Sequence, residues 1–114
     1  MPTRDRVRSR HTAADDIFDL IGKGDNIRQA ASAMQAMAHP LRLKILCLVG
    51  NQELAVSEIV EAVGTSQSNI SQHLAVLRDN ALIEARRDGT KVLYRIADLR
   101  IVKMIALTRE IFCA

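Results

Sequence analysis

The chain has 114 residues, of which 48% are hydrophobic and 3% are aromatic. This length suits one small domain, and such domains often complete the burial of their apolar surface by dimerising. The scarcity of aromatic residues argues against a base-stacking surface for single-stranded nucleic acid, so any nucleic-acid partner is expected to be duplex DNA. Charged residues interrupt every apolar run, and no secretory signal is evident, so we expect a cytoplasmic protein with reduced cysteines.

The formal net charge of +3 is concentrated at the start of the chain. Residues 1–12 contain four arginines and one aspartate, so they account for the whole net charge. Because this segment is polar and aperiodic, we predict a basic flexible arm at 1–12 and one domain at 13–114. Within that domain residues 65–97 are again positive, which suits a polyanionic partner on one face.

The first part of the domain is predicted to be helical. A short helix is expected at 15–21. Apolar residues recur at intervals of three and four within 27–38, which predicts a second helix capped by Asp25 or Asn26.

A third helix is predicted to begin at Pro40, because proline is favoured at the first position of a helix. It runs to about Val49 and is apolar on two sides, one of which includes Cys47. Arg42 and Lys44 are the residues expected to contact solvent. This pattern indicates the central helix of the domain.

Two short helices are predicted after a very short strand at 54–56. Ser57 is predicted to cap the first helix, at 58–63, and Ser66 the second, which ends near Asp79. A brief glycine-containing turn joins them, and this arrangement is typical of a helix-turn-helix.

Beyond these helices the apolar pattern changes from helical to alternating. LIEAR and KVLYRI flank residues 87–90, where Asp-Gly is a strong hairpin signal. Asp98 is expected to cap a final helix through Phe112, whose apolar surface is too wide for one buried face. We expect a second copy to cover the remainder, together with the apolar stripe of 27–38. The fold class is therefore mainly α with a small β-hairpin, in the order α-α-α-α-β-β-α, a dimeric winged helix-turn-helix.

The second helix of the helix-turn-helix has a polar face without acidic residues. A solvated face would mix Glu and Lys, whereas amides and hydroxyls match base edges in DNA, and a helix N-terminus can approach phosphates. A merely polar helix start is the alternative, because Ser and Asn also favour caps. The predicted DNA contacts are Ser66, Gln67, Ser68, Asn69, Ser71, Gln72 and His73.

The tip of the predicted hairpin is basic. Contacts from it to phosphates or the minor groove would add salt-dependent affinity with little sequence preference. A solvated hairpin is the alternative. The predicted contacts of this kind are Arg86, Arg87, Thr90 and Lys91, with Arg78 as a further candidate.

Several stretches of the chain resemble the ArsR-type winged-helix repressors. The likeness covers about residues 26–113, and HPLRLKIL together with SQSNISQHLAVLR is a specific combination. The resemblance implies a homodimeric bacterial transcriptional repressor. Its terminal helices would form the dimer interface, and it would leave its operator DNA when an inducer binds.

Many members of that family sense metals, but this chain departs from their patterns. ELAVSEI, which corresponds to the family's thiolate motif, has no cysteine, and the final helix has Asp98 and Glu110 but no histidine. Three or four suitably spaced ligands cannot be assembled, so we expect no metal and no cofactor. His39 and His73 are interpreted as a helix-start and a recognition-helix residue. An enzyme is not expected, because no catalytic set or phosphate-binding loop is present.

The chain has two cysteines, Cys47 and Cys113. Each is explained as a small hydrophobic residue of the core, since cysteine is among the most buried residue types. A cysteine in LKILC paired with one that ends the final helix as IFC, however, resembles the sulfane-sulfur-sensing (SqrR/BigR-like) branch of the family. That resemblance implies that persulfides or polysulfides react with one thiolate and that an intrasubunit di- or polysulfide link then weakens DNA binding. The alternatives are a peroxide-driven disulfide switch, structural cysteines or, more distantly, a dimeric protein-binding adaptor.

Overall fold

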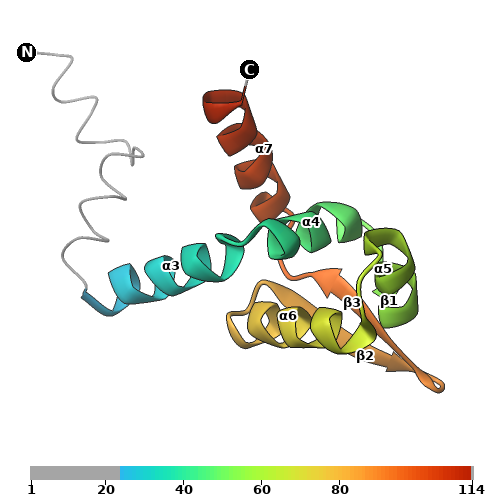
Figure 1. Cartoon of the computed structure of the whole chain (residues 1–114). Coiled ribbons are helices and arrows are strands. Elements are labelled where there is room, and N and C mark those ends of the chain that lie inside the picture. Colours follow the sequence, from blue (N-terminus) through green and yellow to red (C-terminus); the bar gives the residue numbers. More distant parts are fainter. Residues whose placement is uncertain (1–23, 114) are drawn as a thin grey trace, which may run out of the picture. The chain divides into compact units, whose positions relative to one another are not determined.

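The computed structural model describes residues 24–113 of the chain (Figure 1). Within them five helices and three short strands run in the order α3 (Gly24–Met37), α4 (Pro40–Val49), β1 (Leu54–Ala55), α5 (Val56–Val63), α6 (Gln67–Asp79), β2 (Ile83–Asp88), β3 (Lys91–Ile96) and α7 (Arg100–Phe112). The predicted fold class and the order of these elements are confirmed. The expected helix at 15–21 and the arm at 1–12 lie outside the described residues.

The described residues belong to two compact units whose boundary falls within α3. The first unit ends at Ser32, and its described part is the start of α3, where Arg28 pairs with Asp25. The second unit begins at Ala33 and contains all the other elements. The remaining contacts described below lie within this second unit.

The core of the second unit combines α4 with the helix-turn-helix and the base of the hairpin. As predicted, α4 is central, with Ile45, Leu46 and Val49 fully buried. Two expectations for this helix were wrong. Cys47 is exposed. Arg42 is half-buried, because its long side chain folds back over the start of α4 and reaches the Ala36 carbonyl and His73.

Helix α5 begins two residues before the predicted start, at Val56 and not at Glu58. Ser57 does not cap this helix; Ala55 occupies the cap position, and the carboxylate of Glu58 accepts a hydrogen bond of 2.9 Å from the Ala55 N–H. Leu54–Ala55 already pairs with β3, so the chain leaves the sheet directly into the helix. Gly64 ends α5 with φ +83°, a left-handed conformation that glycine adopts without steric cost.

Helix α6 has the predicted apolar face and cap. Ile70, Leu74 and Leu77 are buried, and the Ser66 hydroxyl accepts a hydrogen bond of 3.1 Å from the Asn69 N–H. The core therefore holds one side of α6 and leaves the opposite side free.

The three strands form one antiparallel sheet in the order β1-β3-β2. Strand β2 is longer than predicted, because Arg87 pairs with Val92 and Asp88 with Lys91, so the turn itself is Gly89–Thr90. Gly89 has φ +65°, which suits the first position of a tight two-residue turn. The hairpin β2–β3 is the wing of the fold (Figure 1).

Helix α7 begins after Asp98, whose carboxylate accepts from the backbone N–H and the guanidinium of Arg100. Asp98 thus satisfies a free N–H as predicted, although the cap position itself is Leu99. The hydrogen bonds from Arg100 lower the pKa of Asp98 to about 2. No residue of α7 is buried, and Leu107, Ile111 and Phe112 are 55%, 65% and 80% exposed.

Candidate DNA-binding surface and cysteine pair

The exposed side of α6 carries four of the predicted DNA contacts. Gln67, Ser68, Ser71 and Gln72 are all exposed, and none of their side chains has a hydrogen-bond partner within residues 24–113. Their spacing of one, four and five residues keeps them on one side of the helix, opposite its buried residues. The first turn has no acidic residue, so both the free N–H groups and the helix dipole favour an anion there.

Ser66 and Asn69 have structural roles at the start of α6. The Ser66 hydroxyl caps the Asn69 N–H, and the Asn69 side-chain amide donates 3.1 Å to the hydroxyl of Thr65. These bonds hold the turn that precedes the exposed face. Thr65 was not singled out by the sequence, although a Thr-Ser pair before a helix is itself a capping signal.

His73 does not lie on the exposed side of α6 with the amides and hydroxyls. It is half-buried, and its ring centroid lies 4.6 Å from that of His39 at an interplanar angle of 46°. Arg42 Nη1 lies 3.3 Å from His73 Nδ1. Desolvation lowers the pKa of His73 from its usual 6.5, and the nearby His39 and Arg42 lower it further. The prediction grouped this histidine with the polar face because the apolar spacing of α6 alone cannot reveal a partner from another helix.

The wing carries two kinds of arginine. Arg87 is exposed and has no ion-pair or hydrogen-bond partner among the described residues. Arg86 is held in a bidentate pair with Glu53, with Nε–Oε2 and Nη2–Oε1 distances of 2.7 and 2.8 Å. Hydrogen bonding from Arg86 lowers the pKa of Glu53 below its usual 4.5, so the pair is ionised at neutral pH. Glu53 was missed by sequence reasoning, since it precedes Arg86 by 33 positions.

The remaining residues that were predicted to contact DNA phosphates are exposed. Thr90 lies in the hairpin turn and Lys91 begins β3, and neither has a hydrogen-bond or ion-pair partner within the described part of the chain. Arg78 lies in the last turn of α6 with its Nε 4.0 Å from the Asp79 carboxylate, too long for a strong pair. These three side chains therefore stay available to a ligand.

Both cysteines are free and exposed, so the interpretation of either as a buried core residue is wrong for this chain. Cys47 lies on α4 and Cys113 directly follows α7, with its N–H donating 2.8 Å to the Arg109 carbonyl. Helices α4 and α7 contact each other. The pair thus occupies two elements that pack together.

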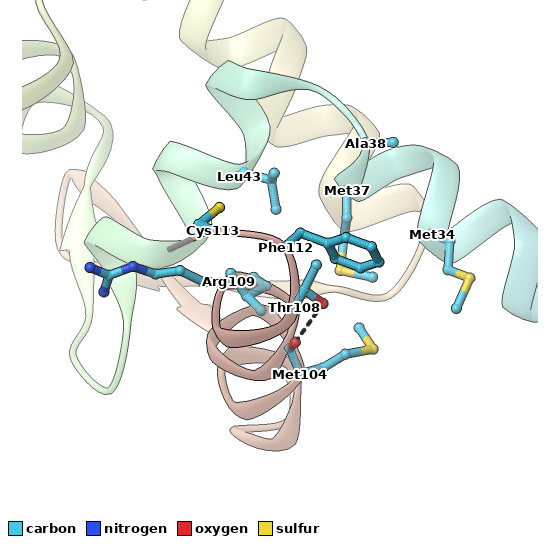
Figure 2. Close-up of a pocket in the computed structure, with 10 residues that line it drawn as sticks. Met34, Met37, Ala38, Leu43, Met104, Thr108, Arg109, Phe112 and Cys113 are labelled. Atoms are coloured by element: carbon cyan, nitrogen blue, oxygen red, sulfur yellow. Dashed lines mark hydrogen bonds between the residues drawn. The ribbon is translucent and has the colours of Figure 1, made fainter.

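Cys113 lies at one side of an apolar cavity of about 480 Å³ that is open to solvent. Figure 2 shows Phe112 and Cys113 at the end of α7 beside Met37 and Leu43 of the neighbouring helices. The cavity is lined almost entirely by aliphatic, thioether and aromatic groups, so it offers little to a polar ligand.

Among residues 24–113, no three His, Cys, Asp or Glu side chains cluster closely enough to hold a metal ion. No helix in this part of the chain is both long and apolar enough to cross a bilayer.

Comparison with known proteins gives a consistent result. The model of bacterial regulatory proteins of the arsR family matches residues 39–85, from the start of α4 into β2. The HTH-type transcriptional regulator YgaV of Escherichia coli is 40% identical over 86 residues, which cover 75% of this chain and 87% of that protein.

Two solved structures share the architecture. The homodimeric winged helix-turn-helix DNA-binding domain Mb0332 from Mycobacterium bovis is 36% identical, with a TM-score of 0.72 over 78% of this chain and 82% of that chain. The transcriptional repressor BigR from Xylella fastidiosa is 26% identical, with a TM-score of 0.74 over 90% of this chain and 99% of that chain.

Proposed function

The chain belongs to the ArsR family of bacterial regulatory proteins, which are DNA-binding transcriptional regulators, and from that premise we propose its mode of action. It is a homodimeric repressor that reads operator DNA with α6 and the wing. It leaves that DNA when reactive sulfur species link Cys47 to Cys113. The observation that carries the DNA-binding part is the exposed amide and hydroxyl face of α6, which is free of acidic groups.

The proposed dimer is supported by the apolar side of α7. This helix buries none of its residues within the described chain and presents Leu107, Ile111 and Phe112 to solvent. Exposed apolar residues concentrated on one element are typical of a protein–protein interface. The similar domain from M. bovis is homodimeric. A symmetric dimer would carry two copies of α6, as a two-fold operator requires.

The sensing step is a thiol–persulfide exchange. A cysteine thiolate attacks the outer sulfur of a persulfide RSSH, which releases the thiol RSH and leaves a protein persulfide. The second cysteine thiolate then attacks Sγ of the persulfidated cysteine and expels the outer sulfur as hydrogen sulfide, which leaves a disulfide. Each further equivalent of persulfide inserts one sulfur atom and releases one more RSH. The exposure of both cysteines supports this chemistry, because the thiolates must meet a dissolved reagent.

The link would act on DNA binding through the helices that it joins. Helix α4 packs against α6, whereas α7 carries the proposed dimer surface. A covalent bridge between Cys47 and Cys113 therefore joins α4, which supports α6, to α7, which would set the spacing of the two subunits. A direct disulfide requires Cα atoms within about 7 Å, and inserted sulfur atoms relax that requirement.

DNA binding is tested first with the reduced protein. Duplexes are selected from a randomised library, and the affinity of the selected duplex is compared with that of a shuffled duplex across a salt series. We expect a clear preference for the selected duplex, which Gln67→Ala and Gln72→Ala weaken. Equal affinity for both duplexes at every salt concentration would favour the protein-binding adaptor instead.

The sensing step is tested by treating the reduced protein separately with glutathione persulfide and with hydrogen peroxide. Intact-mass spectra and DNA affinity are then recorded for the wild type, Cys47→Ser and Cys113→Ser. We expect persulfide to remove two hydrogens, with or without added sulfur atoms, and to weaken DNA binding in the wild type alone. A response to peroxide but not persulfide would make the pair a disulfide switch. Release of DNA by persulfide from both serine variants would make the cysteines structural.

A further inference from the structure

The recognition helix α6 is joined to the start of α4 by a small polar cluster. His73 of α6 packs against the ring of His39, which precedes α4, with a centroid distance of 4.6 Å. Arg42, in the first turn of α4, lies between His73 and the end of α3. Its Nη1 is 3.3 Å from His73 Nδ1, and its Nε donates to the carbonyl of Ala36. All four residues lie in the second unit of the chain.

The hydrogen bonds of this cluster require both histidines to be neutral. A guanidinium has donors and no acceptor, so His73 Nδ1 must accept the bond from Arg42. His39 Nδ1 likewise accepts from the Leu41 N–H, at 3.1 Å, and thereby caps α4. Each imidazole must therefore carry its single proton on Nε2. A second proton on either ring occupies Nδ1 and removes the acceptor.

We propose that Arg42 and the His39–His73 pair position the recognition helix for DNA binding, and that protonation of His73 releases it. This inference rests on the proposed DNA binding by α6. His73 is a positioning residue in this arrangement and does not touch the bases. Its partner Arg42 connects α6 to the end of α3 through the Ala36 carbonyl, so one side chain holds together three helices.

The charge nearest His73 opposes its protonation, because a proton on His73 would face the Arg42 guanidinium. Within residues 24–113, no carboxylate forms an ion pair or hydrogen bond with His39, Arg42 or His73. The other elements that pack on α6 are α5 and β2. Their titratable or charged residues are Glu58 and Glu61 on α5, and Glu84, Arg86, Arg87 and Asp88 on β2. None of them is hydrogen-bonded to His73.

The direction of the pH effect follows from the lowered pKa of His73. A group whose folded-state pKa is depressed contributes stability that is fully present above its unfolded pKa, here 6.5, and that is lost as pH falls through the folded value. The hydrogen bond between Arg42 and His73 is therefore intact at neutral pH and is lost as the pH falls below 6.5 toward the lowered pKa of His73. A protonated His73 Nδ1 cannot accept from Arg42, so we expect DNA affinity to be severalfold lower at about pH 5.5 than at about pH 7.5.

The test uses variants that keep the acceptor but cannot titrate. Asparagine offers an amide oxygen near the position of Nδ1 and is a good helix cap, so His39→Asn/His73→Asn keeps both acceptors neutral at every pH. Affinity for the duplex selected by the wild type is measured by fluorescence anisotropy at the two pH values. We expect the double variant to bind with near wild-type affinity at the higher pH and to lose the pH dependence. His11→Asn removes the remaining histidine of the sequence and is expected to retain the wild-type pH profile.

A second readout does not depend on DNA. Nitrogen chemical shifts of the imidazoles report which nitrogen carries the proton, and amide shifts of α6 report its environment. We expect His39 and His73 to be Nε2–H tautomers at neutral pH, with α6 amides shifting as His73 titrates. A protonated Nδ1 on His73 at neutral pH would overturn the proposal, even for a protein that binds no DNA. So would a His73→Asn variant that keeps the wild-type pH profile but changes base preference at one operator position, because that result would make His73 a base contact.

Discussion

The two adjacent wing arginines are expected to contribute unequally to DNA binding. Arg86 and Arg87 are neighbours in β2, so their side chains leave opposite faces of the hairpin. Arg86 is neutralised by its bidentate pair with Glu53, whereas Arg87 has no such partner among the described residues. Each phosphate neutralised by a cation contributes about 0.9 to the slope of log affinity against log salt concentration.

These facts give a distinct expectation for three substitutions. In a symmetric dimer Arg87→Gln should flatten the salt slope by about 1.8, because one phosphate contact is lost from each wing. Arg86→Gln should change the slope little, because Arg86 is held by Glu53 and is not expected to contact a phosphate. Glu53→Gln should free Arg86 and steepen the slope by up to about 1.8 if both guanidinium groups reach phosphates.

The assay is fluorescence anisotropy of a labelled duplex over a salt series at neutral pH. At this pH the pair is intact, because the hydrogen bond from Arg86 lowers the pKa of Glu53 below its usual 4.5. Arg95→Gln is a matched control, since Arg95 pairs with Glu84 at 3.1 Å on the same hairpin. Equal flattening by Arg86→Gln and Arg87→Gln would refute the reasoning, because it would mean that Arg86 leaves Glu53 to bind DNA.

Three further predictions test the fold and the proposed assembly. Ser66→Ala should lower the free energy of unfolding in urea by about 1 kcal/mol, because the Asn69 N–H loses its cap. The control Ser68→Ala should change this free energy by less than about 0.5 kcal/mol. Equal effects of the two substitutions would mean that the cap does not stabilise α6. Ile59→Ala should cost about 2–5 kcal/mol in the same assay because the side chain is fully buried, and a cost below 1 kcal/mol would contradict that packing. Phe112→Asp, at a position 80% exposed, should leave the fold intact but shift sedimentation to a monomer, and an unchanged dimer would place the interface elsewhere.

The fold was predictable because its signals are local. The spacing of Ile70, Leu74 and Leu77 defines the buried side of α6 without knowledge of any other element. Ser66 before that helix and Asp-Gly in the hairpin are short-range signals of the same kind. The start of α5 was placed less accurately because Ser57 is a good cap by type, whereas the capping contact comes from Glu58.

Part of the candidate site was not predictable, because its contacts join residues far apart in the sequence. Arg42 and His73 are separated by 31 positions, and Glu53 and Arg86 by 33. Residue type alone placed both His73 and Arg86 in direct contact with DNA. Tertiary packing instead gives each of them a partner within the chain. Arg86 is exposed in spite of its partner, whereas His73 is half-buried, and Gln67 is exposed as predicted and has no partner among the described residues.

Helix α4 is the element on which the proposed sulfur link and the proposed proton release both act. Cys47 projects from its exposed side, and His39 and Arg42 hold α6 from its start. If the link to Cys113 weakens DNA binding by moving α4 against α6, it must also change the surroundings of His73. Coupling free energies are reciprocal, so the linked protein should show a shifted His73 pKa, measured by NMR titration of the imidazole without DNA. A linked protein with lower DNA affinity and an unchanged His73 titration would mean that the signal travels through α7 and the dimer surface instead.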